Sequence, residues 1–249
     1  MIFRNLALFS TQQPLVTSHH QAPNQPPTAD FPFAVILPHH QPAQEFNLDF
    51  AARLATASSQ PTQVIVVGPQ HQPTAHSIIA TSNLGILDVP ALVNDDILLA
   101  DHAFTAQLLY LESAFPQASI HGILINSRID MSQLQKLLTE LEENFSPSQT
   151  LYLGSIDFSH YLPLHQAETN DEQMTRYLLQ NQPESIIGLD DDFLDSWPAL
   201  YLIWKLANRQ ETAPQIIAHT NSAYLENGAY SSDSTTSYFY LIFPRPQPN

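Results

Sequence analysis

Three apolar, strand-like runs in this sequence each end in a polar cluster that contains a histidine. The runs are residues 33–37, 64–67 and 151–156, and the histidines that follow them are His39, His71 and His160. Parallel strands of open α/β sheets deliver their site residues at their carboxyl ends. If the three strands are near neighbours, the imidazoles emerge at one edge of one sheet. Neutral imidazole is a common ligand of Zn, Cu, Fe and Ni, so the pattern predicts a metal site.

His39 and His71 are the best pair of metal ligands, because both follow a strand and a short turn. We expect them at the ends of adjacent parallel strands, with imidazoles less than about 8 Å apart, a separation that one metal ion can bridge. The alternative is that each histidine packs under a loop. Asp157 and His160 are three residues apart and fit a catalytic acid–base pair, a ligand, or an orienting pair. His102, at a predicted helix start, is a weaker catalytic candidate.

The elements that must position these residues alternate between strand and helix. A helix over residues 44–57 joins the first strand to a second over 63–67, which gives a βαβ unit. Further apolar stripes predict helices after Asp101 and over 132–145, 164–179 and 197–208, and strands over 119–125, 215–218 and 236–243. The sequence therefore predicts a single α/β domain over residues 31–249, with a central, mostly parallel sheet flanked by helices. Residues 1–30, rich in Gln and Pro, predict a flexible arm.

The composition limits the classes of partner. With 24 acidic against 8 basic residues, the formal charge of −16 argues against nucleic acid and anionic membranes as partners. The absence of cysteine excludes disulfides and thiolate ligands. No apolar run approaches the roughly 20 residues of a membrane span, and the first residues do not form a signal peptide, so we expect a cytoplasmic protein.

Four short motifs carry a resemblance to a known family. They are Pro38-His39, Gly68-Pro69-Gln70-His71, the stretch from Asp101-His102 to Leu111, and Asp157-Phe158-Ser159-His160. Their order and approximate spacing resemble the Memo family, whose bacterial members are called AmmeMemoRadiSam system protein B. The resemblance spans about residues 33–243. It implies a fold like that of the class III extradiol dioxygenases and a pocket in which His39 and His71 match metal ligands, while His102, Asp157 and His160 match other pocket residues.

The chain departs from the family at the position of a cysteine that completes the pocket. The matching segment begins at Leu194, which occupies the cysteine position, and a family glutamate is replaced by Thr105. Asp195, one residue further, is a candidate third metal ligand. The alternative is that Asp195, with Asp191 and Asp192, caps or solvates a helix start.

Three functions follow from these residues. The first is a Memo-like protein that binds iron or copper and has a metal-dependent redox role. The second is an extradiol-type Fe(II) dioxygenase, in which His39, His71 and a carboxylate hold the metal while His102 or His160 moves protons. The third is a metal-free module that binds a small molecule or a peptide. The resemblance also implies a radical-SAM protein and an AMMECR-type protein as partners.

Overall fold

A mixed sheet of nine strands runs through the described part of the chain, which in this computed structural model is residues 30–84, 90–225 and 231–246. The strands are β1 (Ala34–Leu37), β2 (Gln63–Pro69), β3 (Ile78–Ala80), β4 (Leu92–Val93), β5 (Ser119–Ile125), β6 (Thr150–Ser155), β7 (Phe158–Leu162), β8 (Gln215–Asn221) and β9 (Thr235–Phe243). Their order is β4-β3-β5-β2-β6-β1-β9-β7, and β8 pairs with β9. The predicted α/β class is confirmed.

The four central strands are parallel and bring the expected residues to one edge. β2 pairs with β5 and β6, and β6 pairs with β1. The expectation that β1 and β2 are adjacent is wrong, because β6 lies between them. The crossover from β1 to β2 leaves one position open, and β6 fills that position later in the chain. His39, His71 and Asp157 still leave the sheet at the same edge, since all three of these strands run in the same direction.

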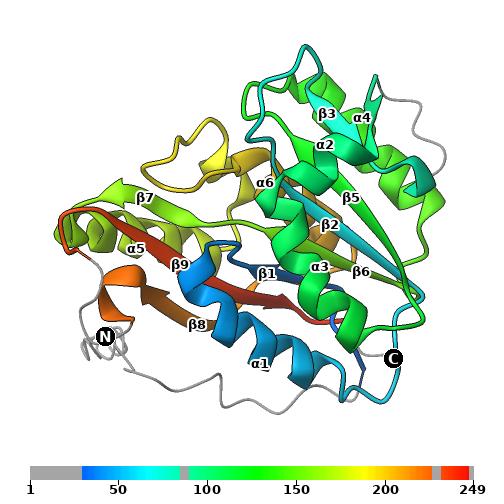
Figure 1. Cartoon of the computed structure of the whole chain (residues 1–249), viewed down its shortest axis with the longest axis horizontal. Helices are drawn as coiled ribbons and strands as arrows, with labels where there is room; N and C mark the ends of the chain where they lie inside the picture. The colour runs from blue at the N-terminus through cyan, green and yellow to red at the C-terminus, as the bar shows by residue number, and fades with distance from the viewer. Residues whose placement is uncertain (1–29, 85–89, 226–230, 247–249) are drawn as a thin grey trace, which may run out of the picture.

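Six α-helices of the described chain cover the two faces of the sheet (Figure 1). They are α1 (Gln44–Leu54), α2 (Asp95–Ala100), α3 (His102–Ala114), α4 (Met131–Asn144), α5 (Leu164–Leu179) and α6 (Trp197–Arg209). In Figure 1, α1 and α3 cross in front of the central strands. Alternate residues of β2 pack into two separate hydrophobic cores, one on each face of the sheet. Val64 and Val66 lie in one core, and Ile65 and Val67 lie in the other. Burial on both faces explains why the central strands are continuous apolar runs.

Predicted and observed boundaries differ most next to the candidate site. The helix predicted over 164–179 is observed with those bounds, and the one predicted over 44–57 ends earlier, at Leu54. No strand was predicted directly after Asp157, but the chain continues there as β7. This strand is irregular, with positive φ angles of 31° at Ser159 and 55° at Tyr161. The predicted arm over residues 1–30 lies outside the described residues except for Asp30.

A close contact at Gly68 brings the start of α3 onto the end of β2. A Cβ atom at Gly68 would lie 3.1 Å from the Cβ of Ala103 and 3.2 Å from the backbone oxygen of Ser155. Both separations are tighter than ordinary van der Waals contact, so glycine permits an approach that a side chain would widen. The approach places the first residue of α3 beside the loop that follows β2.

Candidate metal centre

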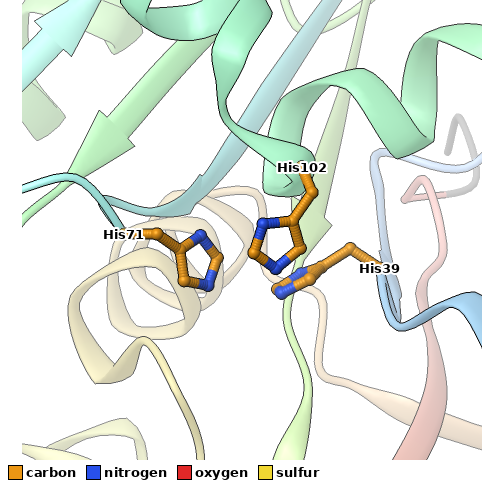
Figure 2. A group of neighbouring side chains, drawn as sticks. All are labelled: His39, His71 and His102. Carbon is orange, nitrogen blue, oxygen red and sulfur yellow. The ribbon is translucent and has the colours of Figure 1, made fainter.

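The imidazoles of His39, His71 and His102 converge at the carboxyl edge of the central strands (Figure 2). The ring centroids of His39 and His71 are 5.3 Å apart, and those of His39 and His102 are 5.0 Å apart. His71 and His102 are stacked, with centroids 4.0 Å apart. One ligand nitrogen from each ring lies within 4.8 Å of the others. We refer to these residues as the three-histidine group.

Each member of this group is held by a different element. His39 follows β1 by two residues and is buried, whereas His71 follows β2 by two residues and is one-third exposed. His102 is the first residue of α3, which begins there because the Asp101 carboxylate caps it by accepting a hydrogen bond of 3.0 Å from the Ala103 N–H.

Asp101 also fixes the orientation of His71. Its carboxylate accepts hydrogen bonds from His71 Nδ1 at 2.8 Å and from the His71 backbone N–H at 3.0 Å. Burial by itself raises the pKa of Asp101, but its bond to His71 and the charge of that ring outweigh burial, so the pKa is lowered overall. Because the ionised carboxylate keeps the proton of His71 on Nδ1, the lone pair of Nε2 is free for a ligand.

Two buried carboxylates lie next to the imidazole of His39. The Nε2 atom of His39 is 3.4 Å from Asp157 Oδ2 and 3.2 Å from Asp195 Oδ2. The backbone N–H of His39 also donates to Asp157 Oδ1 at 3.0 Å. His39, Asp157 and Asp195 offer ligand atoms within 4.8 Å of one another, and this group shares His39 with the three-histidine group. The two groups therefore form one continuous cluster of imidazoles and carboxylates.

Burial and neighbouring charges together shift the pKa values of the groups in this cluster. It lowers the pKa of His39 to about 4, against the opposing effect of the Asp157 charge. Burial, together with His71, also lowers the pKa of His102. For Asp157, burial raises the pKa, but His39 and His160 outweigh it and hold the pKa at about 2. Burial and the charge of Asp157 raise the pKa of Asp195 well above its usual range. The buried imidazole is thus neutral at pH 7, as a metal ligand must be.

Three observations indicate that the residues of this cluster could hold a transition-metal ion. Two metal–nitrogen bonds of about 2.1 Å span at most about 4.2 Å, so ligand nitrogens within 4.8 Å need only a small closure to share one ion. The buried His39 ring is neutral and presents a lone pair. Asp195 Oδ1 is buried and has no hydrogen-bond partner, so the cluster contains an unsatisfied oxygen that a cation could contact.

The structure places every residue predicted for the site close to this cluster. Asp195 is not a helix cap, because the Ser196 hydroxyl caps α6 by accepting from the Ala199 N–H. Asp195 lies beside His39, but no group of ligand atoms in the described chain joins it directly to His71. His160 lies at the border, with Nε2 3.7 Å from Asp157 Oδ2.

The loop between β1 and His39 is held by side chains that sequence reasoning missed. The amides of Asn47 and Gln107 donate to the backbone oxygen of Pro38 at 2.7 and 3.1 Å. Gln107 also donates to the Ser155 hydroxyl, which lies 3.3 Å from His39 Nδ1. Buried Asn and Gln inside apolar helical stripes were the available signal, since such amides need partners.

A cavity of about 470 Å³ opens beside the cluster between α1 and α3. Its lining includes His39 and His102 from the three-histidine group, with Asn47, Thr105 and Tyr110. This volume admits a small organic molecule. The cavity therefore gives such a molecule access to two of the three imidazoles.

The chain was compared with family models, curated proteins and solved structures. No family model matches the chain, and no curated protein matches it. Among solved structures, the chain is similar to an uncharacterized protein from Escherichia coli K12, with 16% sequence identity and a TM-score of 0.47 over 84% of this chain and 98% of that one. A likeness at this level assigns neither a family nor an activity. Within the described residues, no helix is long and apolar enough to cross a membrane.

Proposed function

We propose that this protein binds a transition-metal ion through His39, His71 and His102 and acts on a small molecule that enters the adjacent cavity. The convergence of three imidazoles, with one nitrogen from each within 4.8 Å of the others, carries the proposal. The three side chains come from three separate parts of the chain, and His39 and His102 are more than 60 residues apart. Imidazoles that converge in this way are typical of a site that takes a cation.

The motifs around these residues support a Memo-type protein and, with it, iron or copper as the metal. Imidazole suits both metals, and the absence of cysteine leaves no thiolate to favour Cu(I). A bound ion of this kind would supply Lewis-acid and one-electron chemistry. Asp101 would hold His71 in the ligand tautomer, and Asp157 would orient His39 through the backbone and balance charge. His160, with its ring beside Asp157, is placed to hold or move a proton at the edge of the cluster.

Metal titration of protein purified without an affinity tag tests this proposal. We expect about one Fe(II) or copper ion per chain, and a loss of affinity of at least about 100-fold in His39→Ala and in His71→Ala, because losing a direct ligand costs more than the 10–100-fold of an outer-shell change. His165→Ala is the matched control, since His165 is an exposed histidine on α5. Equal metal binding by the control and both ligand variants would contradict the proposal.

A second candidate ligand set has Asp195 in place of His102, as the sequence suggested. The 3.2 Å contact between Asp195 Oδ2 and His39 Nε2 favours it. Two imidazoles and one carboxylate make the facial arrangement of Fe(II) oxygenases, which would correspond to the extradiol-type alternative. Anaerobic Fe(II) titration separates the two sets. The three-histidine set requires His102→Ala to lose affinity and Asp195→Asn to keep most of it, whereas the second set requires the opposite order.

The remaining alternative is a metal-free module that binds a small molecule or a peptide. It requires that neither Fe(II), copper nor zinc bind the wild-type chain at micromolar concentration. In that case the buried imidazoles and carboxylates would be a polar network lining the cavity, and the metal proposal would be abandoned.

A further inference from the structure

The strand β7 has two residues more than the stretch of β9 with which it pairs. Between residues 158 and 160, β7 advances by two residues while β9 advances by one, so Ser159 has no counterpart on β9. The pairing shifts in the same way between residues 160 and 162, where Tyr161 is the additional residue. These are also the two residues of β7 with positive φ angles, 31° and 55°. Each is therefore a β-bulge, a feature that changes the direction of neighbouring side chains.

The bulge at Ser159 changes the side to which His160 points. Side chains of a regular strand alternate between its two faces, so residues three apart point to opposite faces. Asp157 and His160 are three apart, but Asp157 Oδ2 and His160 Nε2 are separated by only 3.7 Å. The additional residue between them therefore turns His160 to the side of Asp157 and to the edge of the cluster.

Asp171 supplies the side-chain contact that holds this bulge. It lies on α5, which packs against β7 (Figure 1). The carboxylate is buried, and its Oδ1 atom accepts a hydrogen bond of 2.9 Å from the Ser159 hydroxyl. Its Oδ2 atom accepts from the Ser237 hydroxyl on β9 at 2.6 Å and from His219 Nε2 on β8 at 2.8 Å. Hydrogen bonds to an ionised group are about twice as strong as neutral ones, so one carboxylate fixes Ser159 relative to two further strands.

The backbone at Ser159 depends on such support, because a positive φ is unfavourable for serine. Its backbone N–H donates to the Phe193 oxygen at 2.9 Å, and the next N–H, that of His160, donates to the Asp191 oxygen at 2.8 Å. Both acceptors belong to the segment that leads to Asp195. The bulge thus connects the segments that carry the two carboxylates of the cluster.

We infer that Asp171 is a positioning residue for the proposed metal centre: its bond to the Ser159 hydroxyl holds the bulge that presents His160 to Asp157. The inference rests on the proposed function, in which His160 holds or moves a proton at the edge of the cluster. Asp171 belongs to neither group of ligand atoms found in the described chain, so it acts through Ser159 and not by touching a metal ion. A regular strand would put His160 on the opposite face, out of reach of its partner.

Amide hydrogen exchange of metal-free, full-length protein tests the inference in Ser159→Ala, with Ser237→Ala as the matched control. Both variants delete one hydroxyl donor to the same carboxylate, but only the first deletes it from β7. We measure exchange of the His160 amide, which is bonded to Asp191, relative to the Val66 amide in β2. This ratio should rise at least about 10-fold in Ser159→Ala, because a hydrogen bond to a charged group is lost. It should stay near the wild-type value in Ser237→Ala.

Ser159→Gly is a rescue variant that separates positioning from a general loss of stability. Glycine adopts a positive φ without the penalty of alanine, so the bulge should persist without its bond to Asp171. The exchange ratio of the His160 amide should therefore return toward the wild-type value. Co(II) titration adds a readout at the metal centre. Affinity should fall about 10-fold in Ser159→Ala, the lower end of the range for an outer-shell change, and should be retained in Ser159→Gly and in the Ser237→Ala control.

Equal exchange ratios in Ser159→Ala and Ser237→Ala, or no recovery in Ser159→Gly, would overturn the inference. Unchanged Co(II) affinity in Ser159→Ala, with a wild-type protein that binds Co(II), would also overturn it. If the wild-type protein binds no metal, the proposed function fails, and the exchange ratios alone decide whether Asp171 places His160.

Discussion

Asp101→Asn should weaken metal binding more than it weakens the fold. The Asp101 carboxylate both caps α3 and holds His71, and asparagine can replace it in the first role better than in the second. Asparagine is nearly as good a helix cap as aspartate, so α3 should keep its start and the change of cap alone should lower the free energy of unfolding by less than about 1 kcal/mol. The carboxylate, however, accepts from both the ring and the backbone of His71. An amide has a single acceptor oxygen, so one of these contacts becomes donor against donor. The loss of this orienting partner should weaken metal binding about 10- to 100-fold, or about 1.4 to 2.7 kcal/mol.

The assay is competition for Fe(II) or zinc against a chelator of known affinity, with urea unfolding of the same metal-free samples. Asp130→Asn is the matched control, because Asp130 caps α4 by accepting from the Ser132 N–H at 2.7 Å and has no histidine partner. The control should lose neither metal affinity nor much stability. The reasoning is refuted if Asp101→Asn binds metal as tightly as wild type, or if it loses stability by the same free energy that it loses in metal binding.

Three further outcomes are expected. The folded-state pKa of His39 lies near 4, below its ordinary 6.5, so metal-free protein should be most stable above pH 6.5 and lose up to about 3 kcal/mol as the pH falls from 6.5 to 4. Urea unfolding across that range should show a shallower loss in His39→Gln, and an unchanged slope would contradict the assignment. Asp195→Cys should raise Cu(I) affinity at least about 10-fold in anaerobic titration, whereas Leu194→Cys should not. Leu194 is a core residue that pairs with Phe158 on the other side of the segment. The reverse order of affinities would show that the segment is shifted by one residue. Asp171→Ala should cost about 3 kcal/mol in the free energy of unfolding, since that buried carboxylate accepts three side-chain hydrogen bonds, and a loss below about 1 kcal/mol would show that the donors find water.

The sequence predicted the parts of the site that depend on short-range pattern. Apolar runs that end in polar residues located β1, β2 and β6, and strand direction then placed His39, His71 and Asp157 at one edge. The order of the strands could not be predicted from this pattern, because no local sequence feature indicates that β6 lies between β1 and β2. The role of Asp101 was missed for a related reason. Its position predicted a helix cap, but its bond to His71 joins two residues 30 positions apart and depends on how α3 packs on β2.

The close approach at Gly68 has a consequence for the proposed metal centre. Metal sites tolerate errors of only about 0.2 Å in ligand distance, and a Cβ atom added at Gly68 would lie closer to Ala103 on α3 than ordinary contact allows. A methyl group at that position would move His102 away from His71 by a few tenths of an ångström without touching either ring. The size of the residue at position 68 would then set the spacing of His71 and His102, so it would influence which ionic radius the proposed metal centre prefers.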